Sequence, residues 1–378
     1  MPALLLTGCA SFKLPDFEEA EIPVAERWLA VEASAEPFVP QWLDDFSNPQ
    51  LKAVIEEALT NNYNLRAAAY RLEEVRALAL KAGAERRPQV GAGLGAGRQK
   101  RSASGGLTLT EPEVSQYDFN VNLNWELDLW GRLKDRRDAA TLALEQEENL
   151  LNDTRLSLVA TTIRSWYNVV EHQRQVELAR DVLASFESNL NTVEERYEAG
   201  LSTALDLRLT RANTAGARRS LQARQRQFDA AARALEILLG RYPARALEVE
   251  KEIPALKPQF TTGVPSVLLQ RRPDLRAAAR NVERLRKESR VAKKALLPSL
   301  RITGSYGSQS DTFGDVLDFN IWNIAANAAQ PLLQGGRLKA DILQARAALQ
   351  RALAEYGRIA LQAFLDVEQA LAAEGYLK

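Results

Sequence analysis

The chain has 378 residues, enough for two or three ordinary domains or for one large elongated domain. Its 49 basic and 49 acidic residues cancel, so the composition excludes a strongly basic nucleic-acid-binding protein and gives no sign of an acidic partner. No apolar run approaches the roughly 18 residues of a membrane-spanning helix, so any membrane-crossing part would have to be a β-barrel.

The only cysteine, Cys9, lies near the N-terminus in LLLTGCAS. A lone cysteine excludes an intramolecular disulfide and a paired-cysteine metal site. A short apolar run, then the small residues Thr7 and Gly8, then Cys9 predict a lipobox, in which a bacterial processing system lipidates the cysteine. None of the residues before Cys9 is basic, whereas a secretory signal begins with a basic segment, so we expect the natural start to lie upstream or to have been trimmed. Residues 1–9 are thus a predicted signal remnant, and 10–48 a predicted extended segment.

Two parts of the chain repeat each other. NLRAAAYRLEEVRALALKAGAERRPQV, from Asn64, aligns with DLRAAARNVERLRKESRVAKKALLPSL, from Asp274, and the motif GRLK at Gly131 recurs at Gly336. Each repeat has the same predicted order: a helix that ends at a proline, a strand, a polar loop, a second strand and a long helix. We therefore expect repeat 1 over residues 49–240, a proline-rich equatorial linker over 241–264, and repeat 2 over 265–378.

A first helical segment is predicted over residues 49–87. A second runs from about 132 to 199 without proline or glycine, which at 1.5 Å per residue is on the order of 100 Å. Its last part has apolar residues at heptad spacing, typical of a coiled coil: Val176, Ala179, Leu183, Phe186, Leu190, Val193 and Tyr197. Gly200 can end this helix in the left-handed conformation, and Thr203 with Asp206 fits a capping box, so a tight turn reverses the chain.

The returning helix, about 203–239, is shorter than the helix that it follows. We expect a helix of about 25 residues after Arg272 to stack on it, so that the two together match the long helix. The long helix of repeat 2 begins at Arg337 and the chain ends at Lys378, before its own turn. By the repeat argument, we expect about 70 further C-terminal residues in the natural protein.

Four strands are predicted, over about 89–98, 117–129, 299–307 and 320–330. The second strand, YDFNVNLNWELDLW, alternates strictly between two kinds of side chain. One face is apolar: Tyr117, Phe119, Val121, Leu123, Trp125 and Leu127, followed by Leu129. The other face is polar: Asp118, Asn120, Asn122, Asn124, Glu126 and Asp128. A membrane strand of about 9–11 residues has this alternation, so the apolar face is predicted to meet lipid and the polar face to line a water-filled lumen; a long strand in a soluble sandwich is the alternative.

Four strands cannot close a membrane barrel, because the smallest such barrels have eight. Open strand edges are not tolerated in lipid, so several copies must each contribute strands. The expected fold class is mainly α with a membrane β part: long helical hairpins that form an oligomeric α-barrel, and four strands per chain in a shared transmembrane β-barrel.

The segments QWLDDFSNPQLKAVIEEALTNNYNLRAAAYRLEEVRA, RYEAGLSTALDLRLTRA, LLGRYP and LLQRRPDLRAAARNVE resemble the outer-membrane factors of bacterial tripartite efflux pumps. The similarity covers the chain from Cys9 onward and is closest to the lipoprotein-type channels of resistance-nodulation-division systems. It implies a homotrimer, lipid-anchored in the outer membrane and mostly periplasmic, with a twelve-stranded barrel, a helical tube and an equatorial belt. It also implies a periplasmic adaptor protein, an inner-membrane transporter behind it, and drugs or other small solutes as cargo.

The same resemblance implies roles for the turn after residue 199. Gly200, Leu201, Ser202, Thr203 and Asp206 would form the periplasmic tip that touches the adaptor, although simple helix capping explains Thr203 and Asp206 equally well.

Other functions have weaker support. GAGLGA from Gly91 fits a dinucleotide fingerprint but lacks the preceding strand and following helix. His172 is the only histidine, so no metal cluster or nucleophilic triad is expected. Neither an enzyme nor a cofactor is predicted. The main alternative is a lipid-anchored periplasmic coiled-coil scaffold without a pore, which would not need the four amphipathic strands.

Overall fold

The structure is a computed structural model that describes residues 24, 28, 48–100, 113–250, 265–315 and 320–377. The predicted lipobox with Cys9, most of the segment 10–48, and residues 251–264 of the linker lie outside these residues.

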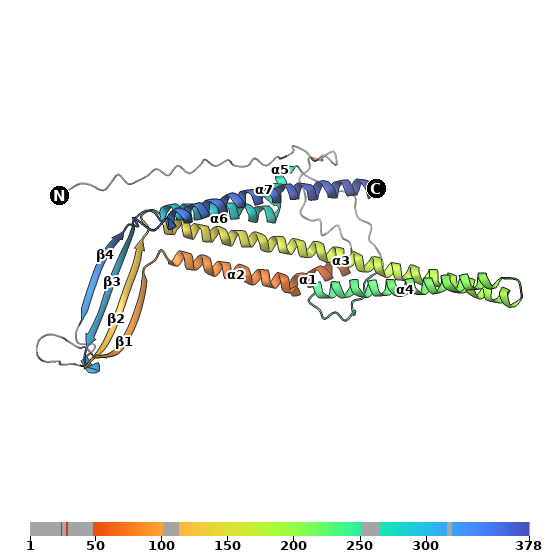
Figure 1. The fold of residues 1–378 in the computed structure, drawn as a ribbon, viewed down its shortest axis with the longest axis horizontal. Helices are drawn as coiled ribbons and strands as arrows, with labels where there is room; N and C mark the ends of the chain where they lie inside the picture. Colours follow the sequence, from red (N-terminus) through yellow and green to blue (C-terminus); the bar gives the residue numbers. More distant parts are fainter. Residues whose placement is uncertain are drawn as a thin grey trace, which may run out of the picture.

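The described chain is elongated, with one four-stranded sheet at one end and, at the other end, the turn that joins two long helices (Figure 1). The helices are α1 (Pro49–Asn61), α2 (Tyr63–Ala84), α3 (Arg132–Glu198), α4 (Ala204–Leu238), α5 (Pro265–Arg271), α6 (Pro273–Lys294) and α7 (Arg337–Leu377), with a short 3-10 helix η2 (Phe313–Asp315). The strands are β1 (Gln89–Lys100), β2 (Glu113–Leu127), β3 (Ser299–Ser310) and β4 (Ile321–Ala329). This mainly helical architecture with four strands confirms the predicted composition of the fold. None of the helices within the described ranges is both long and apolar enough to cross a membrane.

The first helical segment is broken, contrary to the single span expected over 49–87. Asn62 adopts an extended backbone, and its side-chain oxygen accepts hydrogen bonds from the backbone N–H of Asn64 (2.9 Å) and Leu65 (3.1 Å). This N-cap starts α2 as a new helix. The Asn62 side chain also donates to the carbonyl of Leu238 (2.9 Å), which ties the break to the end of α4.

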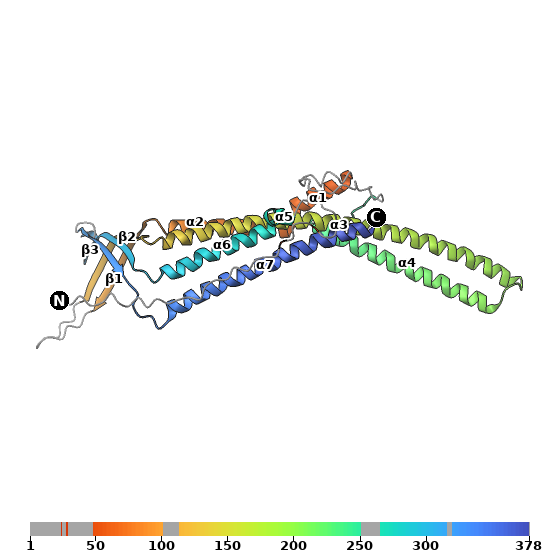
Figure 2. The ribbon, with the colours of Figure 1, turned by 90° about the horizontal axis from the view of Figure 1, so that it is seen from above.

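α3 is the spine of the molecule, and other helices pack along it in turn (Figure 2). α2 and α6 accompany the part near the sheet, and α7 packs on the far side of α6. α4 accompanies the distal part, where Arg218 pairs with Glu187 (2.7 Å) and Arg211 with Glu194 (2.9 Å). Two helices therefore follow one another along α3, as the sequence predicted.

The largest core lies where α1, α2, α3 and α4 meet. Trp166 is the largest fully buried side chain, and it belongs to a cluster that includes Leu51, Val169, Val170 and Leu235. A buried carboxylate lies at the edge of this core: Glu236 is only 1% exposed and accepts the backbone N–H groups of residues 245–247 at 2.5–3.1 Å. These hydrogen bonds outweigh the effect of burial and lower the pKa of Glu236. They fix the course of the chain as it leaves α4.

The sheet is antiparallel throughout, with the strands in the order β1-β2-β3-β4. The two predicted hairpins thus lie side by side, joined by the pairing of β2 with β3. β2 differs from its prediction, because it begins at Glu113 and ends at Leu127 rather than near residue 129. The reason lies in Asp128, whose carboxylate accepts the backbone N–H of Leu133 (3.0 Å) and Lys134 (2.7 Å). The chain has already turned toward α3 at this point, with Gly131 in the left-handed conformation (φ 71°).

Candidate functional site

The register of the four strands gathers their polar side chains on one face of the sheet. Across that face, Gln89, Asn124 and Thr303 form one row, and the next row starts at Gly91 and continues through Asn122, Ser305 and Asn323. Asn120 and Asp118 continue the polar side of β2 toward the far end of the sheet. The polar residues predicted along β2 therefore belong to a surface that all four strands build. Asp128 alone of the predicted set lies outside the strand, where it caps α3.

The polar side chains of β2 on this face are linked to one another by hydrogen bonds. The side-chain N–H of Asn122 donates to the side-chain oxygen of Asn120 (2.6 Å), and the side-chain N–H of Asn120 donates to the carboxylate of Asp118 (3.1 Å). Glycines on β1 make room for this ladder, since a Cβ at Gly95 would lie 2.3 Å from the Asp118 carboxylate and one at Gly93 would lie 3.1 Å from Asn120. The glycines and asparagines together form a surface of small side chains that can make hydrogen bonds.

The opposite face of the sheet is apolar, and most of it is uncovered by the described parts of the chain. Near its far end, Tyr117 contacts the ring of Phe313 in η2 (5.5 Å between ring centroids), and Ser308 is buried. Val121 lies between Ala92 and Tyr306, and Leu123 between Val90 and Gly304. Large exposed side chains from the flanking strands continue this face: Val90, Leu94, Tyr306, Trp322 and Ile324. An apolar surface of this extent requires an apolar environment or a partner.

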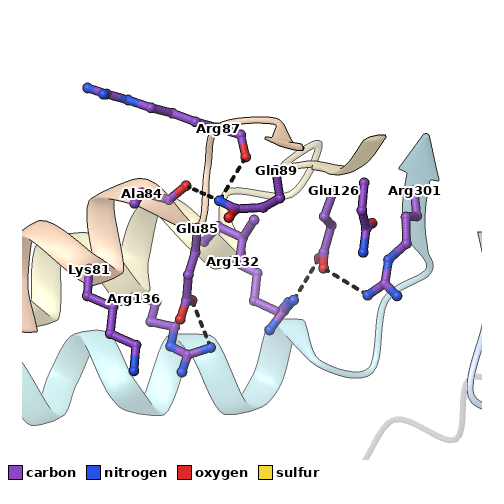
Figure 3. Close-up of a pocket in the computed structure, with 11 residues that line it drawn as sticks. Lys81, Ala84, Glu85, Arg87, Gln89, Glu126, Arg132, Arg136 and Arg301 are labelled. Atoms are coloured by element: carbon purple, nitrogen blue, oxygen red, sulfur yellow. Dashed lines mark hydrogen bonds and ion pairs between the residues drawn. The ribbon is translucent and has the colours of Figure 1, made fainter. Parts of the chain in front are cut away.

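Where the polar face meets the helices, a hollow of roughly 360 Å³ contains charged side chains from α2, α3, β2 and β3 (Figure 3). Glu126 lies between two arginines, at 2.6 Å from Arg132 and 3.8 Å from Arg301. Glu85 pairs with Arg136 at 3.0 Å. Lys81 points into the same region and forms no ion pair with any described residue. The hollow thus carries more positive than negative charge, and all its charged groups remain accessible to water.

In both repeats, a side-chain N–H group from the strand region donates a hydrogen bond to a backbone carbonyl just after the preceding helix. The indole N–H of Trp125 donates to the carbonyl of Arg86 (3.1 Å), and the side-chain amide of Gln330 donates to the carbonyl of Leu296 (2.7 Å). Arg86 and Leu296 are 210 residues apart, which is the shift of the helical repeat, and Trp125 and Gln330 are 205 apart, which is the shift of the GRLK motif. Two different side chains therefore satisfy the equivalent orphan carbonyl at a helix end.

An ion cluster around the buried carboxylate of Asp135 holds α6 against α3 next to the sheet. The carboxylate of Asp135 lies 2.6 Å from Lys294 and 3.5 Å from Lys287, and Lys294 also donates to the carbonyl of Gly131 (3.1 Å). Burial alone would raise the pKa of Asp135, but the two lysines outweigh it and lower that pKa. No sequence motif indicated this cluster, because its members lie about 150 residues apart.

The turn between α3 and α4 has the predicted geometry. Gly200 is left-handed (φ 73°), and Thr203 and Asp206 form a reciprocal capping box. Hydrogen bonds from the Thr203 hydroxyl and backbone, with a further one from Ser202, lower the pKa of Asp206. Leu201 is 79% exposed at the extremity of the turn.

Among the described residues, no group of three His, Cys, Asp or Glu side chains is arranged to hold a metal ion.

Comparisons with known proteins converge on one family. Residues 54–241 and 264–376 match the family described as outer membrane efflux protein. The pyoverdine export outer membrane protein OpmQ of Pseudomonas aeruginosa is 31% identical over 375 residues, covering 97% of this chain and 79% of that protein. The probable outer membrane lipoprotein SilC of Salmonella typhimurium is 28% identical over 380 residues, covering 97% and 80%. Among solved structures, the MtrE outer membrane channel of Neisseria gonorrhoeae in its open state has a TM-score of 0.77 at 27% identity, covering 96% of this chain and 81% of that one.

Proposed function

The chain belongs to the outer membrane efflux protein family, and on that premise we propose that three copies form the outer-membrane exit duct of a tripartite efflux system. The duct conducts solutes passively from a periplasmic adaptor and an inner-membrane transporter to the exterior. The observation that carries this proposal is the sheet with one polar and one apolar face, which is open at both edges.

The sheet explains the need for several copies. β1 and β4 each have one edge without a neighbour in the sheet, and unpaired backbone groups are not tolerated in lipid. Pairing of β1 of one copy with β4 of the next closes the sheet into a barrel. Three copies would give twelve strands, within the range of known membrane barrels.

The two faces then have separate tasks. The apolar residues of β2, Tyr117 to Leu127 at alternate positions, meet lipid. The ladder of Asp118, Asn120 and Asn122 lines the lumen, with Asn124 and Glu126 at its inner end. Because the described part of this lining consists of small and hydrogen-bonding side chains, we expect it to offer little selectivity of its own.

The partners and the anchor follow from the rest of the chain. The exposed turn at Leu201, with Gly200, Ser202, Thr203 and Asp206 around it, is the adaptor-contacting tip. Cys9, outside the described residues, carries the lipid, in line with a relative named as a lipoprotein. Because the relative named above exports pyoverdine, a small organic solute is the class of cargo that we propose.

The mass of the protein extracted from outer membranes tests the proposal. Light scattering in detergent should give a protein mass three times the 42.0 kDa of one chain, and the reconstituted protein should conduct ions across a planar bilayer. Monomers that stay in the soluble fraction would contradict the duct and would favour the scaffold without a pore.

A further inference from the structure

A second charged region adjoins the hollow of Figure 3 and shares Ala84 and Arg87 with it. A groove of roughly 750 Å³ between α2 and α3 is lined by four arginines, Arg76, Arg86, Arg87 and Arg137, and by no carboxylate. Leu80, which is 72% exposed, forms part of its apolar wall. Arg76 pairs with Glu73 (2.6 Å) and Arg137 with Asp138 (3.4 Å), whereas Arg86 and Arg87 form no ion pair with any described residue, so the groove is basic at one end and apolar along its side.

A neighbouring groove between α3 and α6 extends this basic surface. It shares Arg137 and adds Lys287 and Arg290. Its three carboxylates, Asp138, Glu145 and Glu283, all have basic partners at 2.8–3.0 Å. Arg290 is exposed and forms no ion pair with any described residue.

The position of these grooves follows from the helical geometry. The hollow on the polar side uses Arg136 of α3, whereas the grooves use Arg137, about 100° further around the helix. Arg87 extends away from the hollow (Figure 3) and comes directly before Pro88 and β1. Trp125 of the apolar face donates to the carbonyl of Arg86 (3.1 Å), so these arginines begin where the apolar face meets the helices.

One of the arginines has an unmet hydrogen-bonding requirement. The Nε of Arg86 is buried and has no hydrogen-bond partner. A buried donor without an acceptor is costly, and a guanidinium group matches the oxygens of a phosphate particularly well. Arg87 beside it forms no ion pair with any described residue. The buried Nε itself is enclosed by protein, but the exposed guanidinium group of Arg87 is available to an anionic ligand in the groove.

We propose that Arg86, Arg87, Arg137 and Arg290, here called the arginine band, bind the phosphate groups of anionic phospholipids in the periplasmic leaflet of the membrane. The arginines contact the headgroup, and the apolar wall at Leu80 accommodates the start of an acyl chain. Basic clusters at a membrane boundary attract anionic lipid headgroups in this way. The proposal rests on the duct described above, since it needs the apolar face to be embedded in lipid.

Native mass spectrometry of the detergent-extracted protein tests this assignment. The probes are phosphatidylglycerol, zwitterionic phosphatidylcholine and inorganic phosphate, each added to wild type and to the triple variant Arg86→Gln, Arg87→Gln, Arg137→Gln. A control with the same loss of charge is Arg208→Gln, Arg219→Gln, Arg226→Gln, all exposed on α4 far from the sheet. The double variant Arg87→Gln, Arg290→Gln changes only exposed side chains. It therefore tests the proposal even if the triple variant fails to fold.

We expect wild type and control to bind phosphatidylglycerol in preference to phosphatidylcholine, and both band variants to bind it more weakly, by roughly fivefold for each arginine that contacts a phosphate. Equal binding of phosphatidylglycerol by band variants and control would overturn the proposal, as would equal binding of the two lipids by wild type. Displacement of the lipid by inorganic phosphate would instead identify a free-phosphate site. Failure of the duct itself is distinguishable, because the wild-type protein would then neither form trimers nor conduct in a bilayer.

Discussion

The backbones of β2 and β3 approach each other so closely at Gly307, on the polar face of the sheet, that a larger residue is unfavourable there. A Cβ at Gly307 would lie 2.3 Å from the carbonyl oxygen of Phe119, a backbone atom that cannot move without disturbing the β2–β3 pairing. We expect Gly307→Ala to destabilise the assembled protein by about 1–3 kcal/mol, the usual cost of overpacking.

The control for this substitution is Gly91→Ala, on the same face, where an added Cβ meets nothing within 4 Å. The thermal midpoint of the detergent-extracted protein, followed by circular dichroism, should fall only for the first variant. Equal midpoints would mean that the sheet relaxes at Gly307 without cost.

A carboxylate in the middle of α3 is unfavourable in its ionised form. Burial, and then the nearby charge of Asp274, raise the pKa of Asp153, and the nearby Arg272 offsets this only in part. An acid whose pKa is raised in the folded state loses stability as the pH rises through that value. We therefore expect Asp153→Asn to raise the unfolding temperature at pH 7 by at most a few degrees.

This gain should shrink as the pH is lowered toward 4, because a growing fraction of wild-type Asp153 is then protonated and uncharged. Asp181→Asn, an exposed position on the same helix, is the control and should have no effect at either pH. A gain for Asp153→Asn that is independent of pH would show that its charge is not the cause.

At the residue scale, the alternation of polar and apolar residues correctly predicted which side chains of β2 share a face. The two-faced character of β2 was visible in the residue order, and the register extends it across all four strands. The roles of Asp128 and of the Trp125 indole N–H were missed, since both depend on where the neighbouring helices end. The clearance at Gly95 and Gly307 depends on cross-strand distances, which no local pattern contains.

In the turn between α3 and α4, the residue that caps the helix is not the residue that we propose to contact the adaptor. The hydroxyl of Thr203 accepts the backbone N–H of Asp206 and caps α4, whereas the side chain of Leu201 is almost fully exposed. Thr203→Ala should cost about 1 kcal/mol and increase hydrogen exchange in the first turn of α4, and Thr203→Ser should not.

Leu201→Ala should leave that exchange unchanged but weaken binding to the periplasmic adaptor, measured with immobilised adaptor. The opposite result, with normal affinity for Leu201→Ala and lost affinity only for Thr203→Ala, would mean that the shape of the turn and not its exposed leucine is recognised.

Among the elements, helix ends with local signals were predicted best. Gly200 and the capping box have their expected geometry because both are set by residues within a few positions of one another. The break at Asn62 and the folding of residues 245–247 around Glu236 were not foreseen, because each is stabilised by contacts with distant parts of the chain.

For the whole molecule, the decisive question is which face of the sheet meets lipid. Leu123→Arg places a charge in the middle of the apolar face, where an arginine costs about 2–4 kcal/mol at the centre of a membrane. We expect this variant to be lost from the outer-membrane fraction, measured by fractionation and immunoblotting. Asn122→Ser, its neighbour on the polar face, should assemble normally, and equal tolerance of both would contradict the assignment of the faces.

The unbroken course of α3 has a consequence for how such proteins change length in evolution. α3 has 67 residues, and its distal part is paired in register with α4 through Arg218–Glu187 and Arg211–Glu194. An insertion in one arm alone would rotate every later contact out of alignment. Matched insertions of seven residues in both arms would keep the alignment and lengthen the hairpin by about 10 Å. The length of the hairpin can therefore change only when α3 and α4 change together. An evolutionary change in this length requires two matched insertions or deletions in the gene, one for each helix.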